Sequence, residues 1–172
     1  MVRIVELDPV SAVRIERFLA DARGRRVSLT RVRLVTGWLA AAVAATAGAS
    51  GVTLGGAIFL SREAEERLAS QPADALAALG ELLVHECVHV VQYREAGTSR
   101  FLATYLKDYF TSLIEQSSCR RVARLRAYLG IRAEREAFAL TALWASSTVP
   151  GSAGLFPDPL DPSCSEPPSD KV

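Results

Sequence analysis

Cysteine, histidine and unbalanced charge are all scarce in this chain. Its 172 residues include three cysteines, two histidines, and 20 basic against 19 acidic side chains, for a net charge of +1. An odd number of cysteines at unrelated spacings argues against a disulfide framework and a cysteine-based zinc module. We therefore expect a reducing compartment, the cytoplasm. The small net charge predicts no nucleic-acid partner, and the N-terminus lacks the pattern of a secretory signal.

One long uncharged segment stands out against this even distribution of charge. Residues 34–60 contain no charged side chain over 27 positions, a length sufficient to span a bilayer. Five glycines and many alanines in this segment weaken its apolar character. The pattern also changes from helix-like in residues 37–47 to strand-like alternation in residues 52–60. We favour a buried helix followed by a strand, with a membrane span as the alternative.

Both histidines, His85 and His89, belong to the motif HECVH, an HExxH pattern. On a helix, positions four apart lie on one face, so the two imidazoles can bind one metal ion. The surrounding residues 73–96 have helical apolar spacing and no internal proline, with Gly97 as a C-terminal stop. The pattern predicts a zinc site in which Glu86 is the general base for water that the metal activates. The alternative is a core helix whose histidines only form hydrogen bonds.

A catalytic zinc site usually has three protein ligands, and the chain has no further histidine. The acidic residues downstream of the motif that are candidates for the third ligand are Asp108, Glu115, Glu134 and Glu136. Each also has an interpretation as a surface charge, so the residues alone leave this ligand open. Cys87 lies inside the motif but points away from the metal face of a helix, and we expect it to be a small buried hydrophobic residue.

The rest of the sequence is mainly helical in pattern. We expect helices over residues 10–22, 100–114, 119–129 and 131–146, and a short helical turn over 61–70. The apolar stripe of residues 101–114 is interpreted as core. Residues 148–172 contain six prolines and are predicted to form a disordered tail, which leaves residues 1–147 as a single domain.

The stretches TLGGAIFLS, LLVHECVHVVQY and EREA, within residues 50–140, resemble a known bacterial family. This family is the small zincin-like core domain associated with extracellular contractile injection systems. More widely, the chain resembles zincin metallopeptidases with a glutamate ligand. The resemblance implies an α+β, mainly helical, zincin-like fold, in which the HExxH helix packs under a short strand or small sheet. It also implies an active-site strand, residues 52–60, along the substrate cleft.

Carried over by position, the resemblance assigns a role to each residue of the site. The residues that match the zinc ligands are His85, His89 and Glu134. Glu136 is the alternative third ligand, and Glu86 matches the general base. Phe138 stands where larger relatives have an acidic residue or asparagine, so a partner that orients a ligand would have to come from elsewhere.

We therefore predict a metallopeptidase that uses Zn2+ and hydrolyses a peptide or protein substrate, with Glu86 as general base. Such an enzyme also needs a hydrogen-bond donor for the oxyanion. The candidate donors are Tyr93, Arg94, Tyr105 and Tyr109. The alternative function is a non-catalytic zincin-like module that binds zinc for stability or recruits a partner protein.

Overall fold

A small mixed sheet and eight helices make up residues 1–116 and 121–148, the part of the chain that the computed structural model describes. The strands are β1 (Arg3–Glu6), β2 (Arg33–Thr36), β3 (Gly51–Leu54) and β4 (Ala57–Leu60). The helices are α1 (Pro9–Arg23), α2 (Trp38–Ala47), α3 (Arg62–Ser70), α4 (Ala75–Leu79), α5 (Glu81–Ala96), α6 (Thr98–Glu115), α7 (Arg121–Gly130) and α8 (Arg132–Thr148). The expected α+β, mainly helical class is confirmed.

The sheet has the strand order β1-β2-β4-β3. Strands β1 and β2 pair antiparallel, β2 and β4 pair parallel through the α2 crossover, and β3 and β4 form an antiparallel hairpin. The hairpin turns at Gly55-Gly56, where Gly55 has a φ of +63° that suits glycine. The single strand expected over residues 52–60 is therefore wrong, although its sequence contained this turn signal. In the strand order of the sheet, β3 lies at one edge.

The motif helix is shorter than the helix expected over residues 73–96. Gly80, with φ +54° and ψ −126°, separates α4 from α5, because this backbone conformation ends one helix and is accessible to glycine. Asp74 caps α4 by accepting a hydrogen bond from the Ala77 N–H at 2.8 Å. Helix α5 is buried along most of its length, so its side chains must pack on both sides.

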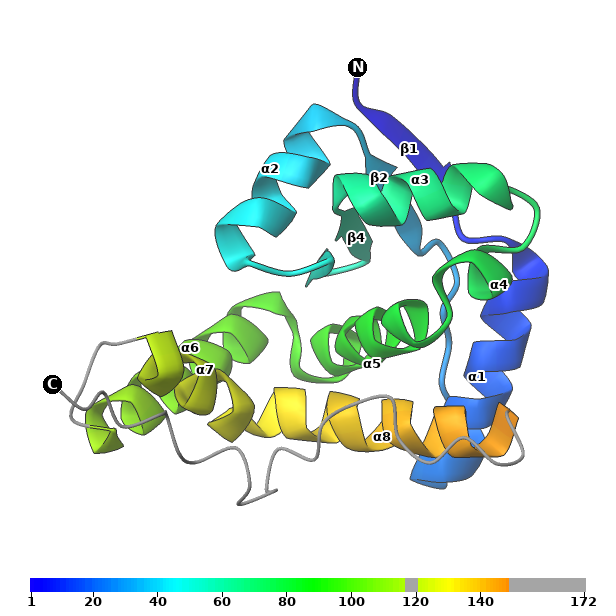
Figure 1. Cartoon of the computed structure of the whole chain (residues 1–172). Coiled ribbons are helices and arrows are strands. Elements are labelled where there is room, and N and C mark those ends of the chain that lie inside the picture. The colour runs from blue at the N-terminus through cyan, green and yellow to red at the C-terminus, as the bar shows by residue number, and fades with distance from the viewer. Residues whose placement is uncertain (117–120, 149–172) are drawn as a thin grey trace, which may run out of the picture.

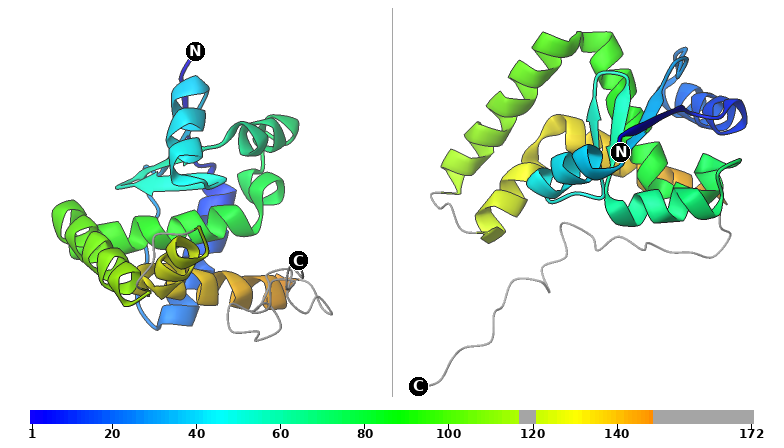
Figure 2. Two further views of the ribbon diagram at one scale, coloured as in Figure 1. Left: turned by 60° about the vertical axis from the view of Figure 1, so that its left-hand side comes forward. Right: turned by 90° about the horizontal axis from the view of Figure 1, so that it is seen from above.

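Helix α5 lies between two layers of structure (Figure 1). The sheet with α2 and α3 covers one side of it, and α8 runs along the other. Helix α1 lies on one flank of α5, and its last residue, Arg23, pairs with Glu95 near the C-terminal end of α5. The α6–α7 hairpin extends from this same end, away from α1 (Figure 2). The core between these layers includes Ile15, Leu19, Leu34, Ile58, Leu60, Leu83, Val84 and Val88.

The uncharged segment of residues 34–60 folds as the end of β2, helix α2 and the β3–β4 hairpin. It therefore contains a helix followed by strands, as favoured from the sequence, but the expected burial of the helix is wrong: in α2 Ala40 and Ala44 are buried, whereas Trp38 is 68% exposed. Among residues 1–116 and 121–148, no helix combines the length and apolar composition that a bilayer crossing needs.

Helix α6 differs from its expected role. Phe101 is buried, but Leu106, Phe110 and Ile114 are 50%, 54% and 77% exposed, so the interpretation of this stripe as core is wrong. Only the first turns of α6 lie against α5, and the later turns extend past it beside α7. Residues 149–172, the main part of the expected tail, lie outside the described residues.

Candidate metal centre

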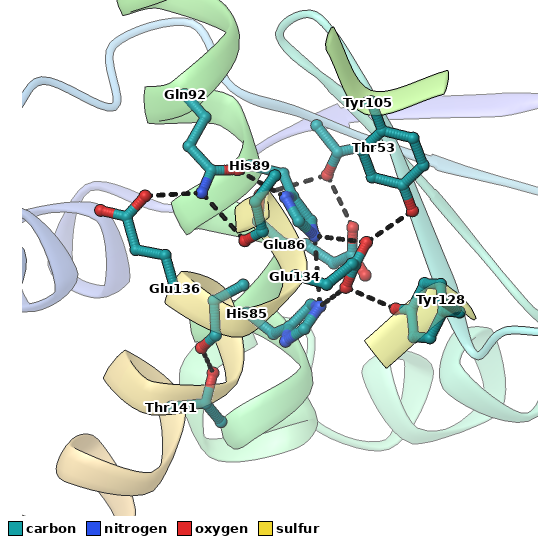
Figure 3. A network of polar contacts seen from close by, with 12 residues as sticks. Thr53, His85, Glu86, His89, Gln92, Tyr105, Tyr128, Glu134, Glu136 and Thr141 are labelled. Atoms are coloured by element: carbon teal, nitrogen blue, oxygen red, sulfur yellow. Dashed lines mark hydrogen bonds and ion pairs between the residues drawn. The ribbon is translucent and has the colours of Figure 1, made fainter. Parts of the chain in front are cut away.

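The two histidines of the motif meet an acidic side chain from a distant helix (Figure 3). His85 and His89 lie one turn apart on the same face of α5, and Glu134 belongs to the first turn of α8. The two histidine Nε2 atoms are 3.2 Å apart, and each lies 3.3 Å from one carboxylate oxygen of Glu134. The structure thus brings together the three residues that the resemblance assigned to zinc.

The spacing and chemistry of these atoms fit a four-coordinate zinc ion. Zinc bonds of about 2.0–2.1 Å to nitrogen and oxygen place neighbouring ligand atoms of a tetrahedron about 3.3 Å apart. The two nitrogens are separated by about this distance, and a different oxygen of Glu134 lies 3.3 Å from each of them. One ligand atom from each residue can be chosen so that all three lie within 4.8 Å of one another. Two imidazoles and one carboxylate also form a donor set that zinc prefers, and it leaves a fourth position for water or substrate.

The electrostatics of the site favour an ionised Glu134. Burial would raise the pKa of this carboxyl, but hydrogen bonds from His85, His89 and Tyr128 hold the pKa well below its ordinary value. Burial would lower the pKa of His89, but its hydrogen bond to Glu134 and the charge of that carboxylate raise the pKa above the ordinary value. An ionised carboxylate is the form of Glu134 that can bind a metal ion.

Gln92 fixes the orientation of the His89 ring. Its Nε2 donates to the carbonyl of Ala133 at 3.0 Å and to Glu136 at 2.8 Å, so its Oε1 must accept from His89 Nδ1 at 2.8 Å. The proton of the neutral ring then sits on Nδ1, which leaves the Nε2 lone pair directed at the metal position. Gln92 is thus the orienting partner that the sequence analysis expected from elsewhere.

Among the described residues, the other acidic candidates for the third ligand have different partners. Glu136 lies outside the metal-binding group, with its carboxylate bonded to Gln92 and to Arg23 at 2.8 Å. Asp108 accepts a hydrogen bond from Arg132 at 2.9 Å, and Glu115 is exposed at the end of α6. The geometry therefore favours Glu134 over Glu136.

The candidate base, Glu86, is 4% exposed and faces strand β3. The hydroxyl of Thr53 lies 2.7 Å from Glu86 Oε2 and donates to it, and the same hydroxyl lies 3.1 Å from the backbone carbonyl of Glu86. An edge strand therefore runs beside the motif helix, as the resemblance implied, but it is β3 alone.

Two tyrosine hydroxyls complete the surroundings of Glu134. Tyr105 donates to Oε1 at 2.7 Å and Tyr128 donates to Oε2 at 2.5 Å. Burial and the negative charge of Glu134 raise the pKa of both phenols far above the ordinary value, so they remain hydrogen-bond donors.

The other expected donors to the oxyanion lie elsewhere. The ring of Tyr93 stacks on Phe101, and the ring of Tyr109 packs on Phe110. Arg94 donates to backbone carbonyls of the segment that precedes β2, among them the carbonyl of Thr30 at 2.5 Å. These side chains anchor helices, so of the four candidates only Tyr105 reaches the metal centre.

Sequence reasoning missed Gln92, Thr53 and Tyr128. Gln92 follows His89 by three positions, and this helical spacing was a usable signal. Thr53 and Tyr128 reach the site from β3 and α7, and no local pattern marks them. Phe138 packs on the His85 ring with centroids 4.8 Å apart, so this departure from larger relatives supplies an apolar wall.

Cys87 is fully buried in the core, as expected. Burial and the neighbouring charge of Glu86 raise the pKa of its thiol far above the ordinary value. The thiol therefore stays protonated and is a poor nucleophile or metal ligand.

Comparison with known proteins identifies a family. Residues 11–97 match the sequence model of the eCIS core domain, and this range runs from α1 through strands β2, β3 and β4 to the end of the HExxH helix. It ends before Glu134, so the third member of the metal-binding group lies outside the matched range. No curated protein and no solved structure matches the chain. Since the match covers just over half of the sequence, the chain belongs to the eCIS core domain family.

Proposed function

We propose that the protein is a zinc-dependent metallopeptidase. The observation that carries the proposal is the group formed by His85, His89 and Glu134, whose ligand atoms lie within 4.8 Å of one another. A carboxylate suited to act as base, Glu86, follows the first of these residues on the same helix. Together they form the residue set of the HExxH peptidases with a glutamate ligand.

The chain's own residues have defined tasks in this reaction. Bound zinc would polarise the scissile carbonyl and lower the pKa of water toward about 7. Glu86 takes the proton from the attacking water and passes it to the leaving amine. Tyr105 and Tyr128 each donate their single proton to Glu134, and we propose that one of them exchanges this hydrogen bond for one to the developing oxyanion.

Strand β3 provides a place for the substrate backbone. Within the part of the chain that the structure describes, β3 pairs with β4 alone, so its other edge keeps unpaired N–H and C=O groups. An extended peptide can add to such an edge as a further strand. Because β3 also contacts Glu86 through Thr53, a peptide bound there would run close to the base.

Metal analysis and a peptidase assay on three proteins test this proposal. The wild type should bind about one zinc per chain and cleave peptides from a mixed library. Glu134→Gln should lose most of the zinc, and Glu86→Gln should keep the zinc but lose activity, because it removes only the base. Absence of zinc from wild-type protein supplied with the metal would refute the proposal.

A second function, a non-catalytic zinc-binding module, is favoured by the burial of the site. Glu86 is only 4% exposed, and the side chains of His85, His89 and Glu134 are 12%, 8% and 4% exposed. Wild-type protein that binds zinc, cleaves no peptide in the library and has the same thermal stability as Glu86→Gln would support this function instead.

A further inference from the structure

Strand β3 meets the motif helix through two alternate residues, Gly51 and Thr53. Positions two apart on a strand face the same side, and both residues are buried against α5, whereas Leu54 is exposed. The atoms that they meet on α5 belong to Glu86. The buried face of the edge strand therefore contacts the carboxylate that we propose as base.

The side-chain hydroxyl of Thr53 forms its observed polar contacts with Glu86 alone. It lies 2.7 Å from Oε2 and 3.1 Å from the carbonyl oxygen of the same residue. A threonine that is 7% exposed must satisfy its hydroxyl, and a valine of the same shape would fill the space equally well. The need to fill space therefore does not explain why this residue carries a hydroxyl. The hydrogen bond from the hydroxyl to the Glu86 carboxylate does explain it.

Gly51 lacks a side chain where the strand passes the Glu86 carboxylate. A Cβ atom at this position would lie 3.1 Å from both Cγ and Oε1 of Glu86, which is tighter than ordinary contact. The backbone of Gly51 has an ordinary strand conformation, so this close approach is the constraint. The hydroxyl of Thr53 thus lies at one carboxylate oxygen and the bare backbone of Gly51 lies beside the other.

We propose that Gly51 and Thr53 are positioning residues that hold the Glu86 carboxylate in the orientation needed for proton transfer. This inference rests on the proposed peptidase function. The hydroxyl of Thr53 holds Oε2 in a hydrogen bond, and the missing side chain of Gly51 lets the carboxylate lie against the strand. The orientation of the base therefore depends on the strand that also offers an edge to the substrate.

Substitutions that keep shape but change the hydroxyl test this inference. In the zinc-loaded protein, Thr53→Val should lower kcat by about 10- to 100-fold with little change in KM, because a displaced base slows only the chemical step. Thr53→Ser should restore most of the kcat. Gly51→Ala should also lower kcat, since Glu86 must move by a few tenths of an ångström. Wild type and Glu86→Gln are the controls.

A crystal structure of each zinc-loaded variant gives a readout independent of activity. The Glu86 carboxylate should leave its position beside β3 in Thr53→Val and keep it in Thr53→Ser. A carboxylate that stays in place in Thr53→Val, or a kcat unchanged by that substitution, would overturn the positioning role. An inactive wild type would instead refute the peptidase proposal, and the crystal structures would still decide whether Thr53 holds the carboxylate.

Discussion

At the scale of single residues, Gln92 has the most constrained role. Its amide joins His89 on α5 to Glu136 and the Ala133 carbonyl on α8. Glu136 in turn contacts Arg23 of α1, whose side chain is only 7% exposed. An amide whose two polar ends are both engaged cannot flip without losing hydrogen bonds. His89 is thus oriented by a chain of contacts that ends on α1.

Replacement of Gln92 by alanine should weaken zinc binding. The substitution removes the acceptor at His89 Nδ1, and loss of such a partner typically lowers metal affinity by about 10- to 100-fold. Competition with a chromophoric chelator measures the affinity. Gln71→Ala is the matched control, since Gln71 lies at the exposed end of α3. Equal affinities for the two variants would contradict the orienting role.

The individual residues of the site were predictable to different degrees. His85, His89 and Glu86 follow from local sequence, because helix periodicity alone puts the two imidazoles on one face. Glu134 needed the resemblance to a family, since its approach to α5 depends on how α6 and α7 return the chain. Tyr128 lies in an arginine-rich helix, and only the packed structure shows that its hydroxyl meets Glu134.

At the scale of elements, Asp8 links the starts of two helices. Its Oδ1 accepts from the Ser11 N–H at 2.8 Å to cap α1, and its Oδ2 accepts from the Ala75 N–H at 3.1 Å in α4. One carboxylate thereby satisfies backbone donors of two helices that are distant in sequence.

Asp8→Ala should lower the free energy of unfolding by about 1–2 kcal/mol at pH 7. Burial would raise the pKa of Asp8, but its hydrogen bonds to Ser11 and Ala75 lower the pKa below the ordinary value of 3.8. A lowered folded-state pKa means that the contribution is fully present above pH 3.8 and is lost as the pH falls through the folded-state pKa. Urea unfolding of both proteins from pH 7 to pH 2.5 measures this difference.

The control for this prediction is Asp21→Ala, which removes an exposed carboxylate from the same helix. Its effect on unfolding should be small at every pH, because it has no capping role. A loss of stability equal to that of Asp8→Ala would show that charge on α1, rather than capping, is responsible.

The helices were predictable where their ends carry local signals. The structure begins α1 at Pro9 and ends it at Arg23, close to the expected residues 10–22, because Pro9 and Gly24 mark its ends in the sequence. The break at Gly80 was not predicted, since the apolar pattern continues through it. Strands β1 and β2 were missed because each has four residues and no clear alternation, and their pairing is set by distant partners.

At the scale of the whole molecule, zinc should stabilise the fold, because the ligand atoms come together only in the folded state. Zinc at about 100 times its dissociation constant should raise the free energy of unfolding by about 2.7 kcal/mol. For a chain of this size the melting temperature should then rise on the order of 5–10 °C. Thermal scans with zinc and with chelator measure the shift, and a similar shift in Glu134→Gln would contradict the site.

The candidate ligands lie on two helices, α5 and α8, that are far apart in the sequence. A bound ion joins points separated by about 45 residues and so closes a covalent loop that contains all of α6 and α7. Strands β1 to β4 and helix α1 lie outside this loop. Metal loading would therefore restrict the helical hairpin that carries Tyr105 and Tyr128 while leaving the connectivity of the sheet unchanged. The ion would act as a reversible cross-link for the helical segment between α5 and α8.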